Sequence, residues 1–171
     1  MIRIVALIAG VALGGCYGVD YSHDYDRDQD FAALETWAWA PSLASEAERG
    51  PRISGLNRER IEKAVASELA RKGYRQVDAT SADFRVRYDA AVRSRVDWDT
   101  NPHDDGHFAD IYTYDEGTLV VDVLRGADDR LIWRGAARSV VEFEMTPEER
   151  DERVREAVEG IFARFPPSPS E

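Results

Sequence analysis

Two histidines lie four residues apart in an acidic stretch of the chain, which reads His103-Asp104-Asp105-Gly106-His107. Imidazole and carboxylate groups together suit zinc or copper. A loop fixes two such rings less firmly than a helix does, so this spacing alone is not specific for a metal. We therefore weigh His103 and His107 as candidate metal ligands against an acidic loop that binds no metal, and we favour the loop without a specific metal site.

A second acidic run imitates part of a calcium-binding loop. Carboxylates of Asp24, Asp26, Asp28 and Glu35 stand at relative positions 1, 3, 5 and 12. Gln29 stands at position 6, where calcium loops need a glycine for a sharp turn. We interpret residues 16–30 as the attachment cysteine followed by a polar, solvated tether, and expect the folded domain to begin at Phe31.

Five arginines, Arg93 among them, fall on outward positions of two predicted strands. The other four, which we take as a candidate ligand or partner face, are Arg85, Arg87, Arg134 and Arg138. In an acidic protein such a set could offer a local cationic face to a glycan, a lipid phosphate or a protein partner. The alternative is cross-strand pairing with Asp89, Asp122, Glu142 and Glu144, which asks for no ligand. We favour the pairing.

Cys16 is the only cysteine, and it follows an apolar run from Ile4 to Leu13. That run suits a secretory signal, because a membrane-spanning helix needs about 20 apolar residues. Leu13-Gly14-Gly15-Cys16 resembles the bacterial lipobox, with cleavage between Gly15 and Cys16 and a thioether-linked lipid on the new N-terminus. Acyl chains such as palmitate would then hold the protein on a membrane, since two or more chains make a durable anchor.

The residue after the cysteine is Tyr17 rather than Asp, which by the sorting rule of enteric bacteria indicates the outer membrane, facing the periplasm. Loss of the predicted signal peptide, residues 1–15, moves the formal net charge from −11 to −12, because Arg3 is its only charged residue. Such an acidic chain argues against nucleic acid as a partner. A single cysteine excludes an internal disulfide.

Enzyme signatures are missing from the sequence. It contains no nucleophile elbow, no phosphate-binding glycine loop and no His-Glu-x-x-His pattern. We therefore predict no catalytic residues, no cofactor and no enzymatic activity.

The elements that must position these residues follow from hydrophobic spacing. Alternation predicts strands over 35–40, 82–92, 117–125 and 131–143, with turn residues at 126–129 and a polar loop over 97–115. Apolar residues three or four apart predict a helix from Asn57 to Gly73 and another from Pro147 to Phe165. Thr146 and Glu149 form a capping box at the start of the second helix, and residues 166–171 are an expected disordered tail.

This order of strand, helix, three strands and helix predicts an α+β fold. Both helices have one apolar stripe, so the simplest packing places them on one face of an antiparallel sheet of about four strands. One domain over residues 31–165 accounts for the whole pattern.

Several short motifs occur along the chain in an order that is typical of one family. They are Tyr25-Asp26, Thr36-Trp37-Ala38-Trp39, Leu69-Ala70-Arg71-Lys72-Gly73-Tyr74, Ala82-Asp83-Phe84, Glu116-Gly117-Thr118-Leu119 and Leu131-Ile132-Trp133-Arg134-Gly135. Together they resemble the bacterial lipoproteins grouped as domain of unknown function 4136. The resemblance implies an exported, usually lipid-anchored α+β domain and brings no catalytic residues with it.

The sequence thus predicts a membrane-anchored envelope lipoprotein with a non-enzymatic binding domain. Its expected partner is an envelope protein or a glycan, and its expected role is envelope maintenance. The alternative is a periplasmic protein that binds a metal or another small ligand through the 97–115 loop.

Overall fold

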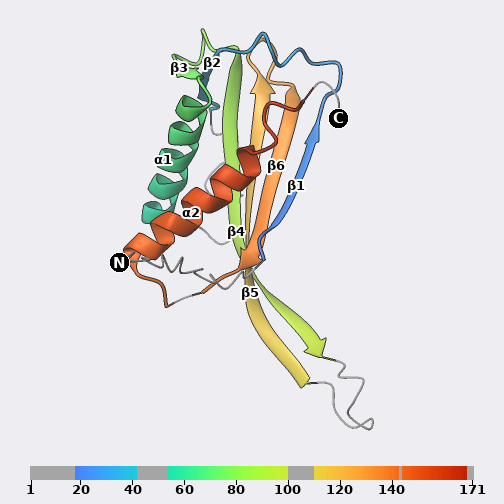
Figure 1. Ribbon diagram of the computed structural model, residues 1–171, viewed down its shortest axis with the longest axis vertical. Coiled ribbons are helices and arrows are strands. Elements are labelled where there is room, and N and C mark those ends of the chain that lie inside the picture. The colour runs from blue at the N-terminus through green and yellow to red at the C-terminus, as the bar shows by residue number, and fades with distance from the viewer. Residues whose placement is uncertain (1–17, 42–53, 100–109, 143, 169–171) are drawn as a thin grey trace, which may run out of the picture.

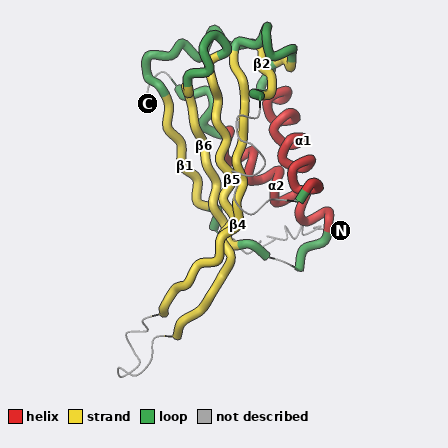
Figure 2. Tube along the Cα trace, turned by 180° about the vertical axis from the view of Figure 1, so that it is seen from behind, coloured by secondary structure: helices red, strands yellow, loops and turns green. Residues whose placement is uncertain are grey.

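A computed structural model describes residues 18–41, 54–99, 110–142 and 144–168. Two helices cover one face of a mixed six-stranded sheet (Figures 1 and 2), whose strand order is β1-β6-β5-β4-β2-β3. The strands are β1 (Asp20–Tyr25), β2 (Thr36–Trp39), β3 (Arg75–Gln76), β4 (Phe84–Asp99), β5 (Asp110–Arg125) and β6 (Leu131–Val140). The helices are α1 (Gly55–Arg71) and α2 (Pro147–Phe162). The predicted α+β class is confirmed.

The sheet differs in detail from the expected antiparallel sheet of about four strands. β4, β5, β6 and β1 pair antiparallel, whereas β2 runs parallel to both β4 and β3. The parallel pair arises because α1 lies between β2 and β4 in the chain and returns it to the same end of the sheet. The two additional strands, β1 and β3, form the sheet edges, where polar sequences are tolerated.

The interpretation of residues 16–30 as a tether is wrong from Asp20 onward. Residues 20–25 form β1, which pairs with β6 from Asp20↔Arg138 to Tyr25↔Trp133. The strand has polar residues because it is an edge strand whose side chains are mostly exposed. Tyr21 links the strand to α2, because its hydroxyl donates to the Glu156 carbonyl at 3.3 Å.

The prediction of a polar loop over 97–115 is also wrong at both ends, which lie in strands. β4 continues to Asp99 and β5 begins at Asp110, and they stay paired throughout. β6 leaves them at Val140, opposite Glu116, so residues 94–99 and 110–115 project as a two-stranded hairpin arm, here called the ribbon (Figure 1). Because no third strand or helix covers it in the described structure, its sequence lacks the alternation that marks a half-buried strand.

Local capping interactions define the ends of the two helices. The predicted Thr146–Glu149 capping box is present, with Glu149 N–H donating to Thr146 Oγ1 at 3.2 Å and Thr146 N–H to the Glu149 carboxylate at 2.7 Å. α1 is capped by Ser54, three residues before the predicted start at Asn57, and the Asn57 backbone N–H donates to the Ser54 side chain. Gly73 follows α1 with φ 94°, in the left-handed region that glycine adopts without strain.

The core lies between the helices and the sheet. Its largest fully buried side chains are aromatic: Trp37, Phe84, Trp133, Phe162 and Phe165. Trp133 stacks on Phe162 with ring centroids 5.7 Å apart, joining β6 to α2. Neither α1 nor α2 lies on the opposite face of the sheet, which is called the helix-free face below (Figures 1 and 2).

Candidate functional site

The helix-free face of the sheet is centred on a buried carboxylate. Asp122 of β5 is 5% exposed and lies between arginines on the two neighbouring strands. Arg134 Nε and a terminal nitrogen donate to it at 2.6 Å and 2.9 Å, and Arg87 Nε donates at 2.9 Å. The fold brings these side chains together because Arg87, Asp122 and Arg134 stand in one cross-strand row.

Burial alone would raise the pKa of Asp122, because it disfavours the charged form. The hydrogen bonds and charges of Arg134 and Arg87 outweigh burial and hold the pKa of Asp122 below its usual value. The carboxylate therefore stays ionised and keeps both guanidinium groups ordered. Each arginine remains about half exposed, with side-chain exposures of 40% for Arg87 and 50% for Arg134.

The other two arginines predicted for this face behave differently. Arg85 turns to the end of the sheet, where it donates to the Ala79 carbonyl at 2.9 Å and 3.1 Å and forms an ion pair with Asp129. Arg138 is exposed and stands in register with Asp20 on β1. The favoured interpretation, cross-strand pairing, holds for Arg87 and Arg134, while Arg138 has no ion pair among the described residues.

A band of small side chains crosses the same face beside the Asp122 row. Its members are Ser22, Ala91, Thr118, Val120 and Ala136, which lie half-buried or exposed on four adjacent strands. Small side chains therefore lie beside the charged Asp122 row on this face. A partner that binds here would meet arginines that are already held in place.

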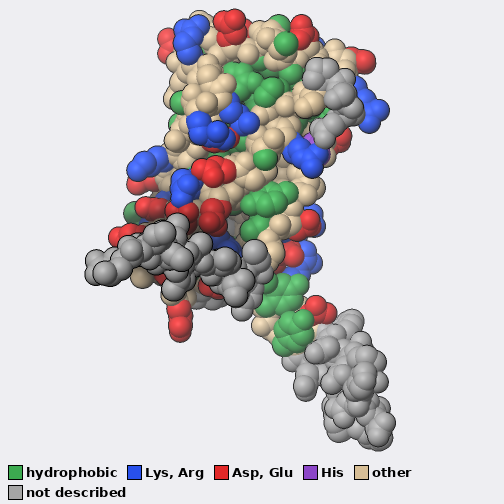
Figure 3. All heavy atoms as spheres, viewed as in Figure 1, with side chains coloured by type: hydrophobic (Ala, Val, Ile, Leu, Met, Phe, Trp, Pro, Cys, Tyr) green, Lys and Arg blue, Asp and Glu red, His purple; other side chains and the backbone are tan. Residues whose placement is uncertain are grey.

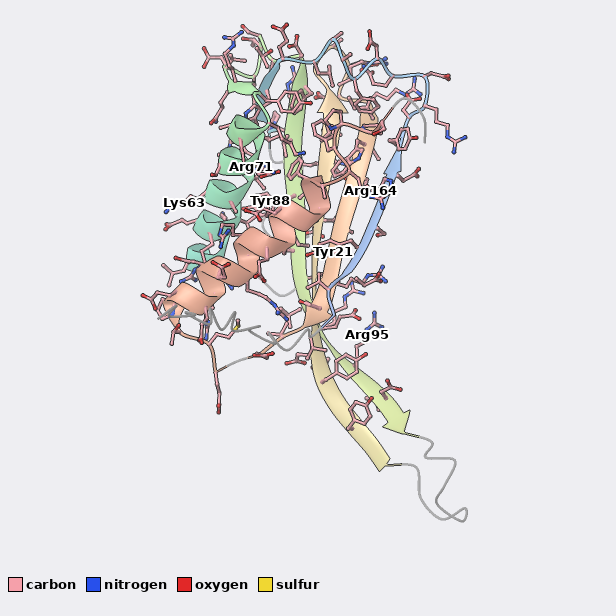
Figure 4. All side chains as sticks on the ribbon, viewed as in Figure 1. Tyr21, Lys63, Arg71, Tyr88, Arg95 and Arg164 are labelled. Carbon is pink, nitrogen blue, oxygen red and sulfur yellow. The ribbon has the colours of Figure 1, made fainter. Side chains whose placement is uncertain are left out.

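Sequence reasoning missed a groove between the outer sides of α1 and α2. It encloses about 540 Å³, and charged side chains of both signs line it (Figures 3 and 4). Glu68 is 3% exposed there and receives two hydrogen bonds of 2.7 Å from Arg71. Arg60 bonds to Asp151 and Arg155 to Glu159, so most of the charges in the groove are already paired. The Arg60–Asp151 pair, which joins the two helices, could not have been found from spacing, since its residues are distant in the sequence.

The ribbon and the start of the first strand lie at the same end of the molecule. Asp20 of β1 and Thr118 of β5 lie opposite Arg138 of β6 in the strand register. Arg138 is only two residues from Val140, where β6 ends beside the base of the ribbon. β1 then runs away from the ribbon, so its first residue, Asp20, lies at the ribbon end of the sheet (Figure 1). Gly15 and Cys16, the predicted cleavage and lipidation positions, lie outside the described residues.

The predicted metal ligands His103 and His107 also lie outside the described residues. Among the residues that are described, no group of three or more His, Cys, Asp or Glu side chains could hold a metal ion. In the calcium-like run, Asp26 forms an ion pair with Arg130 at 2.7 Å, and Asp24 lies in β1. None of the helices in the described part of the chain is long and apolar enough to cross a membrane.

Comparisons with known proteins agree with the fold. The family model described as Domain of unknown function (DUF4136) matches residues 21–167, which confirms the resemblance seen in the sequence. A DUF4136 family protein from Bacteroides thetaiotaomicron superposes with a TM-score of 0.56 at 17% identity, over 86% of this chain and 96% of that one.

A PDZ domain protein from Parabacteroides distasonis also superposes with a TM-score of 0.56, at 15% identity over 88% of this chain. This chain spans only 36% of the length of that protein. At such low identities both likenesses concern the fold alone. A comparison with curated proteins finds no match.

Proposed function

Because the chain belongs to the DUF4136 family, for which no molecular function is defined, we propose its role from its own residues. It is a lipid-anchored protein of the bacterial cell envelope, fixed through Cys16 and placed on the periplasmic side of the outer membrane. Its domain is a non-enzymatic binding module that contributes to envelope maintenance. The observation that carries the proposal is the position of the lipobox-like Leu13-Gly14-Gly15-Cys16, whose cysteine stands four residues before the first strand.

This spacing suits an anchored domain. A cleaved chain would begin at Cys16, and four residues span at most about 14 Å when fully extended. The folded domain would therefore stay next to the membrane surface. A short link restricts the partners it can meet to molecules at that surface.

Metabolic labelling tests the anchor directly. The full-length protein is produced in a bacterial host fed an alkyne analogue of palmitate, and the label is detected on the purified protein. We expect labelling of the wild type and none of Cys16→Ser, since the chain has no other cysteine. An unlabelled wild type, or equal labelling of both proteins, would rule out the anchor.

The helix-free face is the surface we assign to the partner, an envelope protein or a glycan. Small side chains lie beside the Asp122 row, and Asp122 holds Arg87 and Arg134 in place before any partner arrives. Ordered side chains lose less conformational entropy on binding. The mixed charges of this row suit a partner that carries polar groups of both kinds.

A photo-crosslinking amino acid in place of Arg138 tests this surface in cells. The matched control replaces Ala127, an exposed residue in the turn between β5 and β6 at the far end of the sheet. We expect a specific crosslinked product from position 138 that is missing from position 127. The same products from both positions would show that the face has no partner of its own.

The alternative function, binding of a metal or small ligand through residues 97–115, stays a prediction. Its candidate ligands are His103 and His107. Zinc titration of the wild type and of a variant with both histidines replaced by Ala would decide it, because equal affinity of the two proteins would exclude a site there.

A further inference from the structure

Exposed apolar side chains gather at the ribbon end of the molecule. Val96 is 60% exposed and Tyr112 is 49% exposed, and both lie on the ribbon. Val92 and Val140, at the base of the ribbon, are also exposed. Figure 3 shows hydrophobic side chains along the arm where it leaves the body. Solvent-facing apolar groups in one projecting element indicate a surface that contacts something else.

The ribbon reaches farther than the segment that would anchor the domain. From Thr118, in the row of Asp20, the strand β5 extends eight residue positions to Asp110, or about 26 Å. Asp20 stands four positions after Cys16, a separation that the chain spans with at most about 14 Å. Since Asp20 and the ribbon lie at the same end of the sheet, the ribbon is long enough to reach a bilayer to which Cys16 is attached.

The chemistry of the ribbon decides how deep it can go. Tyrosine suits the boundary between headgroups and acyl chains, because its ring is apolar and its hydroxyl is polar. Tyr112 and Tyr114 lie on one face of the ribbon with ring centroids 6.1 Å apart. Asp97 accepts a hydrogen bond from the Tyr112 hydroxyl at 3.3 Å, and Arg95 pairs with Glu116 at 3.1 Å at the base (Figure 4). Charged groups are costly in hydrocarbon, so these residues keep the ribbon at headgroup level.

We infer that the ribbon rests in the headgroup layer of the membrane that holds the lipid anchor, with Val96 and Tyr112 in contact with lipid. The inference rests on the proposed anchoring at Cys16. The ribbon then gives the domain a second attachment to the membrane besides the acyl chains. With two attachments the domain has a defined orientation, and its helix-free face keeps a constant angle to the surface.

Depth-dependent fluorescence quenching tests this arrangement in the full-length lipidated protein. A cysteine is introduced on the ribbon (Thr113→Cys) or in the opposite turn (Ala127→Cys) and labelled with a small fluorophore. Cys16 does not compete for the label once its sulfur carries the lipid. The protein is reconstituted in phosphatidylcholine vesicles that contain a nitroxide on the lipid headgroup. We expect severalfold stronger quenching at position 113 than at position 127.

A longer tether supplies the matched variant. A flexible Gly/Ser insert of about ten residues after Tyr17 lengthens the link without touching the domain, and we expect it to reduce the quenching at position 113. Equal quenching at the two positions in vesicle-bound protein, or no effect of the insert, would overturn the inference while leaving the anchor intact. Protein recovered without lipid on Cys16 would overturn the anchor and the inference together.

Discussion

Asp122 and Arg134 face each other across β5 and β6 in a two-point contact, with N···O distances of 2.6 Å and 2.9 Å. Arg87 on β4 donates to the same carboxylate, so one buried side chain joins the three central strands. A carboxylate in this position replaces the water that two half-exposed guanidinium groups would otherwise bind. The contact orders the face that we assign to a partner.

Replacement of Asp122 by Asn should destabilise the fold by about 2 kcal/mol, because hydrogen bonds to charged groups are lost and two cations remain side by side. Urea unfolding followed by circular dichroism measures the loss. Asp89→Asn is the control, since Asp89 is exposed on the same strand as Arg87. Equal stability of the two variants would show that the Asp122 contacts are not important for folding.

The same carboxylate should make the protein sensitive to acid. Its pKa in the folded state lies below the ordinary value of 3.8. A depressed folded pKa contributes stability above pH 3.8, and that contribution is lost as the pH falls from 3.8 through the folded value. The difference in unfolding free energy between wild type and Asp122→Asn should therefore shrink as the pH is lowered below 3.8. A difference that stays constant with pH would contradict this origin.

The Asp83 side chain links the start of β2 to the start of β4 through hydrogen bonds. Its carboxylate accepts from the backbone N–H of Thr36 at 2.8 Å and from the Thr36 hydroxyl at 2.7 Å, and these bonds lower the pKa of Asp83. Asp83→Ala should lower the unfolding free energy by about 1 kcal/mol, as loss of a capping side chain does. Asp83→Asn keeps an acceptor oxygen and should recover part of the lost unfolding free energy. The stabilities of the two variants are compared by thermal unfolding. If Asp83→Asn were no more stable than Asp83→Ala, the hydrogen bonds of Asp83 would not stabilise the fold.

Gly160 of α2 leaves room for Tyr21 on β1. A Cβ built at Gly160 would lie 2.2 Å from Tyr21 Cζ, so Gly160→Ala should push the tyrosine away and loosen the edge strand. Hydrogen exchange should become faster in residues 20–25 than in the central strands. Gly55→Ala is the control, because a Cβ there meets nothing within 4 Å. Unchanged exchange in β1 would show that Tyr21 does not hold it.

Periodicity predicted both helices and the strands that have one buried face. Val86 and Val123 alternate with polar residues because one side of β4 and β5 packs on the core, and that alternation is visible in the sequence. The capping box at Thr146 is a local pattern, which explains why it was predicted correctly. The direction of β2 could not be predicted, since spacing says nothing about which strands become neighbours.

Elements without a buried face escaped prediction for the same reason. β1 reads Asp-Tyr-Ser-His-Asp-Tyr and gains its order from pairing with β6 rather than from apolar spacing. The ribbon is solvated on both faces among the described residues, so Thr113 and Asp115 gave no sign of a strand. Arg87 and Arg134 were placed on the correct face, but their shared partner depended on strand register.

We propose that Cys16 is a lipidated N-terminus immediately before the domain. The decisive measurement is the intact mass of the protein, produced from the full-length sequence and extracted with detergent from the membranes of a bacterial host. We expect a chain that has lost residues 1–15 and carries diacylglyceryl and acyl groups on Cys16. A chain that begins at any other residue, or that begins at Cys16 with an unmodified thiol, would contradict it.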